Sequence, residues 1–146
     1  IEMALVVGGG RCESGTGAAA WLGHNLRWRG GEVCYVEGRP FDSGRDLTFR
    51  AIEFREPCKE SRQRPWLTLD VVAVKDTVAR ARVCPMPVRQ RGDADDVMCP
   101  FGAICRLWRA RLGEEPPARG RISASRAEAT WPMFVSASGL AWGTGS

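Results

Sequence analysis

Two arginine–glutamate pairs and one lysine are the residues of this chain whose types and spacing could do chemistry. Arg29 and Glu32 lie three positions apart in an apolar stretch with helical spacing. Arg50 and Glu53 repeat this spacing further on, and Lys75 is one of only two lysines. Arginine is the permanently charged, fork-shaped cation that suits a phosphate group. By itself, an Arg-x-x-Glu pair on a helix is a surface ion pair that contributes about 0.2–0.5 kcal/mol.

The sequence lacks the patterns of a catalytic triad, a phosphate-binding loop or a zinc site. The single histidine, His24, has no sequence context that would complete a Ser-His-Asp set, and the phosphate-loop pattern G-x-x-x-x-G-K-[ST] is absent. None of the six cysteines forms a C-x-x-C pair, and the separation of Cys99 from Cys105 is not a structural zinc spacing. We therefore expect no metal site and reduced thiols that are mostly small core residues.

The composition indicates a basic domain that can bury a core. The chain has 146 residues, 44% of them hydrophobic, and a formal net charge of +4. All but two of its 21 basic residues are arginines. An arginine-rich domain suits nucleic acid, although GC-rich coding DNA also produces this bias. No apolar run approaches the roughly 18 residues of a membrane span, so we expect no membrane association.

Two helices are predicted from the spacing of apolar residues, one over 18–35 and one over 100–112. The first carries the first Arg-x-x-Glu pair and also two glycines, each of which weakens a helix by about 1 kcal/mol relative to alanine. The second begins at Pro100, which suits a first helical position, and stops before Gly113, which suits a left-handed terminus.

Alternation of apolar and polar residues predicts three strands and a later strand-like run, 47–54, 66–74, 81–90 and 131–137. The polar segment between the first two strands reads as a linker or a long hairpin loop. Pro85 and Pro87 cannot donate ladder hydrogen bonds, so the third strand is expected at an edge. Residues three apart in a strand point to opposite faces, so Arg50 and Glu53 would cooperate only if their segment were helical.

These elements predict an α+β fold in which helices pack on a small three-stranded antiparallel sheet. We expect a single domain over 1–146. Within it, 1–17 is a Gly-rich N-terminal remainder and 18–146 is the folded core.

Five segments carry a resemblance to a known family: 21-WLGHNLRWRGGEV-33, 47-LTFRAIEF-54, 67-LTLDVVAVKDT-77, 98-MCPFGAICRLWRARL-112 and 132-PMFVSASGLAW-142. In this order and spacing they resemble the first part of the catalytic domain of tyrosine recombinases, also called phage integrases. The first resembles the helix that delivers Arg-x-x-Glu. The next two resemble the two strands that lead to a hairpin lysine. The last two resemble a Cys-Pro helix and the extended segment before a His-x-x-Arg motif.

The resemblance implies DNA breakage and rejoining through a phosphotyrosine, with no metal or nucleotide cofactor. It makes Arg29 the arginine that stabilises negative charge on the phosphate, with Glu32 orienting it. It makes Lys75 the general acid that protonates the leaving 5′-hydroxyl. Arg27, Lys75 and Arg80 are then the residues expected to contact double-stranded DNA.

The resemblance further implies an intracellular protein, found with DNA in a nucleoid or nucleus, whose copies assemble on DNA as part of a mobile element. The family's His-x-x-Arg motif and nucleophilic tyrosine do not occur before Ser146, and Tyr35 is misplaced for that role. We therefore expect this chain to be a fragment that binds DNA without cleaving it. A non-enzymatic α+β interaction module, a decayed mobile-element remnant and a spurious reading frame remain as alternatives.

Overall fold

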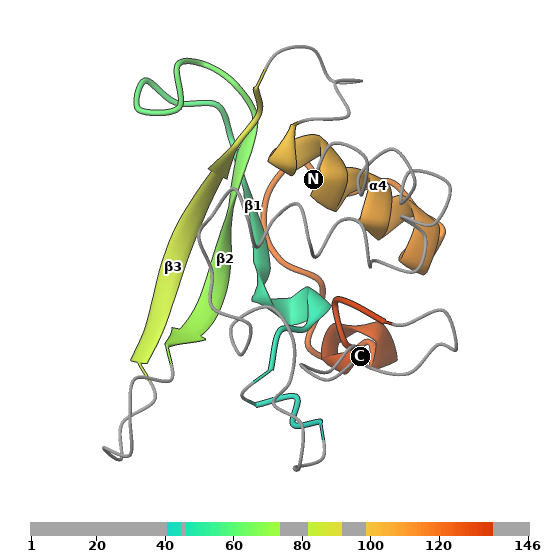
Figure 1. Cartoon of the computed structure of the whole chain (residues 1–146). Coiled ribbons are helices and arrows are strands. Elements are labelled where there is room, and N and C mark those ends of the chain that lie inside the picture. The colour runs from blue at the N-terminus through green and yellow to red at the C-terminus, as the bar shows by residue number, and fades with distance from the viewer. Residues whose placement is uncertain (1–40, 45, 74–81, 92–98, 136–146) are drawn as a thin grey trace, which may run out of the picture.

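The fold is built on a three-stranded antiparallel sheet with a helix packed against it (Figure 1). This computed structural model describes residues 41–44, 46–73, 82–91 and 99–135. The elements in chain order are η2 (Phe49–Ala51), β1 (Ile52–Arg55), β2 (Trp66–Ala73), β3 (Arg82–Arg89), α4 (Pro100–Leu112) and η3 (Ala127–Thr130). The sheet order β1-β2-β3 follows the chain order, so the strands form a meander. The predicted α+β class with a small three-stranded antiparallel sheet is confirmed.

One face of the sheet forms the core because apolar side chains alternate along its strands. Ile52 and Phe54 of β1 are buried and stand opposite Leu69 and Leu67 of β2. Helix α4 closes this face with Trp108, which is 1% exposed. The ring of Trp108 meets Phe54 edge to face, with centroids 5.3 Å apart. Such a pair adds about 0.5–1.5 kcal/mol to the gain from burial.

Helix α4 has the bounds that the sequence predicted, because both of its ends carry local signals. Pro100 is the first residue, and Gly113 ends the helix with a φ of 68°, a left-handed conformation that glycine adopts without strain. Cys99 and Cys105 are free thiols and are buried, as expected. Burial raises the pKa of the Cys105 thiol to about 11.

Both outer edges of the sheet carry features that hinder pairing with a further strand. Pro85 and Pro87 of β3 face Asp70 and Thr68 of β2. Because proline has no N–H, these pairs must be the ones whose main-chain groups point away from β2, so the free edge lacks two donors. On the other side, Phe54 of β1 exchanges two main-chain hydrogen bonds with Gly120, of 2.9 and 2.8 Å. The prediction that β3 is an edge strand is confirmed.

Two predicted strands are wrong in part. The segment 47–54 is not one strand, because Phe49–Ala51 form a turn of 3-10 helix and the strand begins only at Ile52. The run 131–137 is described as far as residue 135 and contains no strand there. It pairs with Thr48 through an isolated bridge at Pro132, and Val135 is also a bridge residue. Bends at Trp131, Met133 and Phe134 interrupt the extended backbone that a strand needs.

The predicted helix over 18–35 lies outside the described residues. Within the part of the chain that is described, no helix has the length and apolar character that crossing a membrane requires. α4, the one α-helix described, has 13 residues.

Candidate functional site: an arginine pocket

The residues that the resemblance assigns to catalysis and DNA contact fall outside the described ranges. Arg27, Arg29 and Glu32 belong to residues 1–40, and Lys75 and Arg80 belong to residues 74–81. Their roles therefore stay predictions. The site that the described residues do form lies elsewhere.

The second Arg-x-x-Glu pair is described, and its members have different partners. Arg50 lies in η2 and Glu53 in β1, so the segment is not helical across the pair. The Arg50 guanidinium donates to the main-chain oxygen of Ile122. Glu53 instead accepts a hydrogen bond of 2.7 Å from Arg121. As expected for a non-helical segment, Arg50 and Glu53 bind different partners and do not act as a pair.

Arg121 is the centre of a charge-balanced cluster on the sheet face opposite α4. Its Nη2 lies 2.7 Å from Glu53 and its Nη1 lies 2.8 Å from Asp70. Nη1 also donates to the main-chain oxygen of Arg50 at 3.0 Å. Arg55 adds a further ion pair to Glu53 at 3.4 Å. The cluster joins β1, β2 and η2, and its positive charges are matched by carboxylates.

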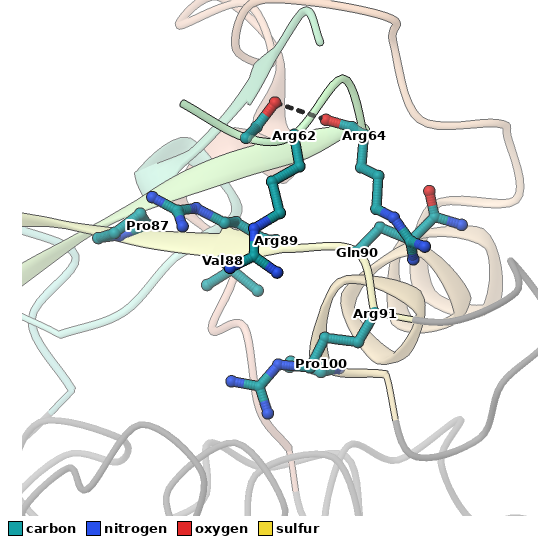
Figure 2. Close-up of a pocket in the computed structure, with 9 residues that line it drawn as sticks. Arg62, Arg64, Pro87, Val88, Arg89, Gln90, Arg91 and Pro100 are labelled. Atoms are coloured by element: carbon teal, nitrogen blue, oxygen red, sulfur yellow. Dashed lines mark hydrogen bonds between the residues drawn. The ribbon is translucent and has the colours of Figure 1, made fainter. Parts of the chain in front are cut away.

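A second group of arginines surrounds a pocket of about 810 Å³ at one end of the sheet. Its walls come from the β1–β2 hairpin loop, the end of β3 and the start of α4 (Figure 2). Four of the lining residues are arginines: Arg62, Arg64, Arg89 and Arg91. Among the described residues that line the pocket, none is acidic. We call this feature the arginine pocket.

The sheet register explains why the four arginines meet. The triplet Arg-Gln-Arg occurs twice, at 62–64 and at 89–91. The hairpin of β2 and β3 pairs Trp66 with Arg89, and the amide of Gln90 donates to the oxygen of Pro65 at 3.1 Å. Two steps further in the same register, Arg64 falls opposite Arg91, so one arginine of each triplet meets there. Two segments some 27 positions apart in sequence thus build one site.

The hairpin loop that carries Arg62 and Arg64 is held by a buried serine. Ser61 is 3% exposed. Its hydroxyl lies within hydrogen-bond distance of the Cys58 amide at 3.0 Å, the Cys58 oxygen at 3.0 Å and the Arg64 oxygen at 2.9 Å. One side chain therefore fixes both limbs of the loop, and the loop backbone is ordered before any ligand arrives.

Two residues at the tip of this loop are in the left-handed region. Arg62 has a φ of 56° and Gln63 a φ of 60°. For residues other than glycine this conformation costs about 1–2 kcal/mol each. Strain of this kind persists where the surroundings impose it, and it concentrates at functional sites. Here it directs Arg62 across the end of β3, as Figure 2 shows.

The floor of the pocket is fixed by the thiol at the start of α4. Cys99 is the N-cap of α4, and its Sγ accepts from the amide of Gly102 at 3.4 Å. The same Sγ accepts from the amide of Arg91 at 3.1 Å. The thiol thus ties the end of β3 to the first turn of α4. The positive end of the helix dipole lies beside the pocket, where Pro100 is a lining residue.

The pocket arginines differ from the other arginines in what balances their charge. Ion pairs to carboxylates hold a first group: Arg55, Arg109, Arg119, Arg121 and Arg126. Arg111 is half-buried, donates to Met133 at 3.0 Å and lies over the ring of Phe49, and burial lowers its pKa. Across the described ranges, no ion pair involves Arg62, Arg89 or Arg91. Their positive charge is available to an anion.

Sequence reasoning missed this site. The loop was expected only as a linker or hairpin loop, and its arginines had no predicted role. The available signal was the repeated Arg-Gln-Arg triplet, each copy next to a strand end.

No group of three or more His, Cys, Asp or Glu side chains in the described segments could hold a metal ion. Comparisons with models of protein families, with curated proteins and with solved structures found no match.

Proposed function

We propose that this chain binds the phosphate backbone of double-stranded DNA, and that it is the DNA-binding part of a site-specific tyrosine recombinase. The observation that carries the first half is the arginine pocket, whose described lining residues include four arginines and no acid. Arginine binds phosphate through two parallel N–H donors, and backbone phosphates supply most of the affinity of nucleic-acid-binding proteins.

The recombinase half of the proposal is supported by the order of elements. A meander of three antiparallel strands is followed by a helix that begins at Cys99-Pro100, which is the order that the resemblance implies. Within this proposal Arg29 and Glu32 act on the scissile phosphate and Lys75 on the leaving hydroxyl. Assembly of copies on DNA inside the cell belongs to the same proposal. It rests on analogy of fold and order, a weaker basis than the pocket.

The length of the sheet indicates how many base pairs of DNA could lie along it. The arginine pocket lies at the end where Trp66 pairs with Arg89, and the opposite end is the pair of Ala73 and Arg82. Lys75 follows Ala73 by two residues in sequence. The eight residues of β2 span about 26 Å, which equals about eight base pairs of a duplex. A duplex lying along the strands would therefore reach from one end of the sheet to the other.

The test is the salt dependence of DNA binding by the whole chain. Fluorescence anisotropy with a labelled duplex should give an affinity that falls steeply with salt. The variant Arg62→Gln/Arg89→Gln should bind about 10- to 100-fold more weakly and should lower the slope of log affinity against log salt by about 2. The matched control is Arg109→Gln/Arg126→Gln, which removes the same charge from arginines that carboxylates already balance.

The control variant should keep the affinity and slope of the unmodified chain. Binding that is absent at low salt would sink the proposal and favour a non-enzymatic interaction module. Equal losses in the two variants would mean that net charge, and not the arginine pocket, attracts the DNA. Circular dichroism of each variant checks that the fold is retained.

A further inference from the structure

We infer that the arginine pocket receives two or more adjacent phosphates of one chain, and that a single phosphate group leaves it largely unfilled. This inference deepens the proposed function, because it specifies the ligand of the same site. It rests on the size of the pocket, on the spread of the guanidinium groups and on the lack of an ion pair at Arg62, Arg89 and Arg91 within the described residues.

The size argument compares the pocket with one phosphate. The pocket volume of about 810 Å³ lies in the range of sites that hold whole small-molecule ligands. A phosphate group displaces only a few water molecules, on the order of 100 Å³ in all. The pocket therefore has room for several linked groups.

The arrangement of the side chains agrees with an extended ligand. In Figure 2, Arg62 and Arg64 descend from the hairpin loop on separate paths, and the Arg64 guanidinium lies beside Gln90. The Arg91 guanidinium lies apart from both, toward Pro100. Because the three groups point to different parts of the pocket in this view, a single tetrahedral anion matches their arrangement poorly. A linear anion with a charge on each unit matches it better.

The positive charge of the pocket arginines also favours a ligand with several negative charges. Arg62, Arg89 and Arg91 have no ion pair with a carboxylate in the described parts of the chain, and they share one pocket. Like charges this close repel each other, and a single phosphate offsets only part of the repulsion. Each added phosphate offsets more, so affinity should rise along a phosphate series.

The test uses inorganic orthophosphate, pyrophosphate and tripolyphosphate with the whole chain, by isothermal titration calorimetry at constant ionic strength. The dissociation constant should fall at least about 10-fold from orthophosphate to pyrophosphate and again to tripolyphosphate, since each new charge-assisted contact is worth about that factor. Arg62→Gln and Arg91→Gln should each weaken tripolyphosphate binding about 10-fold and orthophosphate binding by less. Arg109→Gln, which removes one charge outside the pocket, should leave the series unchanged.

The outcomes separate this inference from the proposed function. Equal affinity for the three anions overturns it, and so does tripolyphosphate binding that ignores both pocket variants. If those results occur while Arg62→Gln/Arg89→Gln still weakens DNA binding, the inference fails and the proposed function stands. If the phosphate series behaves as expected but DNA does not bind, the pocket takes free polyphosphates and the proposed function fails.

Discussion

Arg121 and the arginine pocket place the same side chain in two opposite settings. Arg121 reaches two carboxylates within 3 Å, Glu53 at 2.7 Å and Asp70 at 2.8 Å, and also a main-chain oxygen. The pocket brings four arginines together, and the lining that the structure describes holds no acid. Arg121 is 27% exposed and crosses between β1 and β2. The pocket arginines instead stand on a loop and at a strand end.

Nearby carboxylates decide whether an arginine's charge is balanced inside the fold. Where acids surround the guanidinium, its ion pairs stabilise the fold by joining separate elements. Where acids are absent, the repulsion among like charges is a cost of the free protein that an anion removes on binding. The predictions below test this contrast, beginning with the largest expected effect.

Replacing Arg121 by methionine should destabilise the fold by about 2–3 kcal/mol. The change leaves Glu53 and Asp70 half-buried without their shared partner, and an uncompensated pair of like charges is costly. Urea unfolding measures the loss. Adding Glu53→Gln and Asp70→Asn should recover at least half of it, because the unpaired charges are then removed. A loss that the second pair of changes fails to reduce would contradict the electrostatic reading.

Cys99→Ala should cost about 1–2 kcal/mol and should also weaken DNA binding. The alanine leaves the amides of Arg91 and Gly102 without their acceptor, and Arg91 loses its fixed position at the pocket. Cys99→Ser keeps an acceptor at the N-cap and should restore most of both losses. Chemical denaturation and anisotropy on the same samples give the two readouts. If serine behaves like alanine, packing of the sulfur matters and its hydrogen bonds do not.

Gln63→Gly should stabilise the protein by about 0.5–1 kcal/mol, since glycine adopts a φ of 60° without strain. The gain is smaller than the strain because glycine also loses more chain entropy on folding. Thermal unfolding detects it as a raised Tm. DNA affinity should stay the same, because Gln63 is not a lining residue. A lower Tm would show that the loop tip is not strained.

Arg109→Gln should change stability by no more than about 0.5 kcal/mol. Arg109 pairs with Glu115 at 2.9 Å, but the side chains are 50% and 76% exposed. This variant sets the scale for loss of a solvated ion pair. An effect as large as that of Arg121→Met would remove the distinction between the two kinds of paired arginine.

The sequence predicted the parts of the fold that carry local signals. Helix α4 is marked by Pro100 and Gly113, and its bounds were predicted correctly. Strands β2 and β3 follow the alternation of apolar residues closely. The 3-10 turn before β1 was missed, although the buried hydrophobic residues there run 47, 49, 52 and 54. The shift from even to odd spacing between Phe49 and Ile52 was the available sign of an inserted turn.

The arginine pocket could not be predicted in the same way, because it depends on strand register. The two Arg-Gln-Arg triplets are visible in the sequence, but the register that pairs Trp66 with Arg89 and sets Arg64 opposite Arg91 is not. The cap interaction of Cys99 with Arg91 also crosses between segments. A site built from one short segment can be found from its motif, whereas one built across a hairpin needs the register first.

The hindered edges of the sheet have a consequence for how this protein behaves when crowded. An open strand edge invites pairing with other chains and is a common start of aggregation. Here Pro85 and Pro87 leave β3 without donors at two positions, and Gly120 occupies the outer side of β1. Copies gathered on one DNA molecule would be held at high local concentration, and these edges would keep their sheets from fusing. If copies assemble on DNA as proposed, contacts between neighbours would then run through side chains and loops, which can separate again more easily than paired strands.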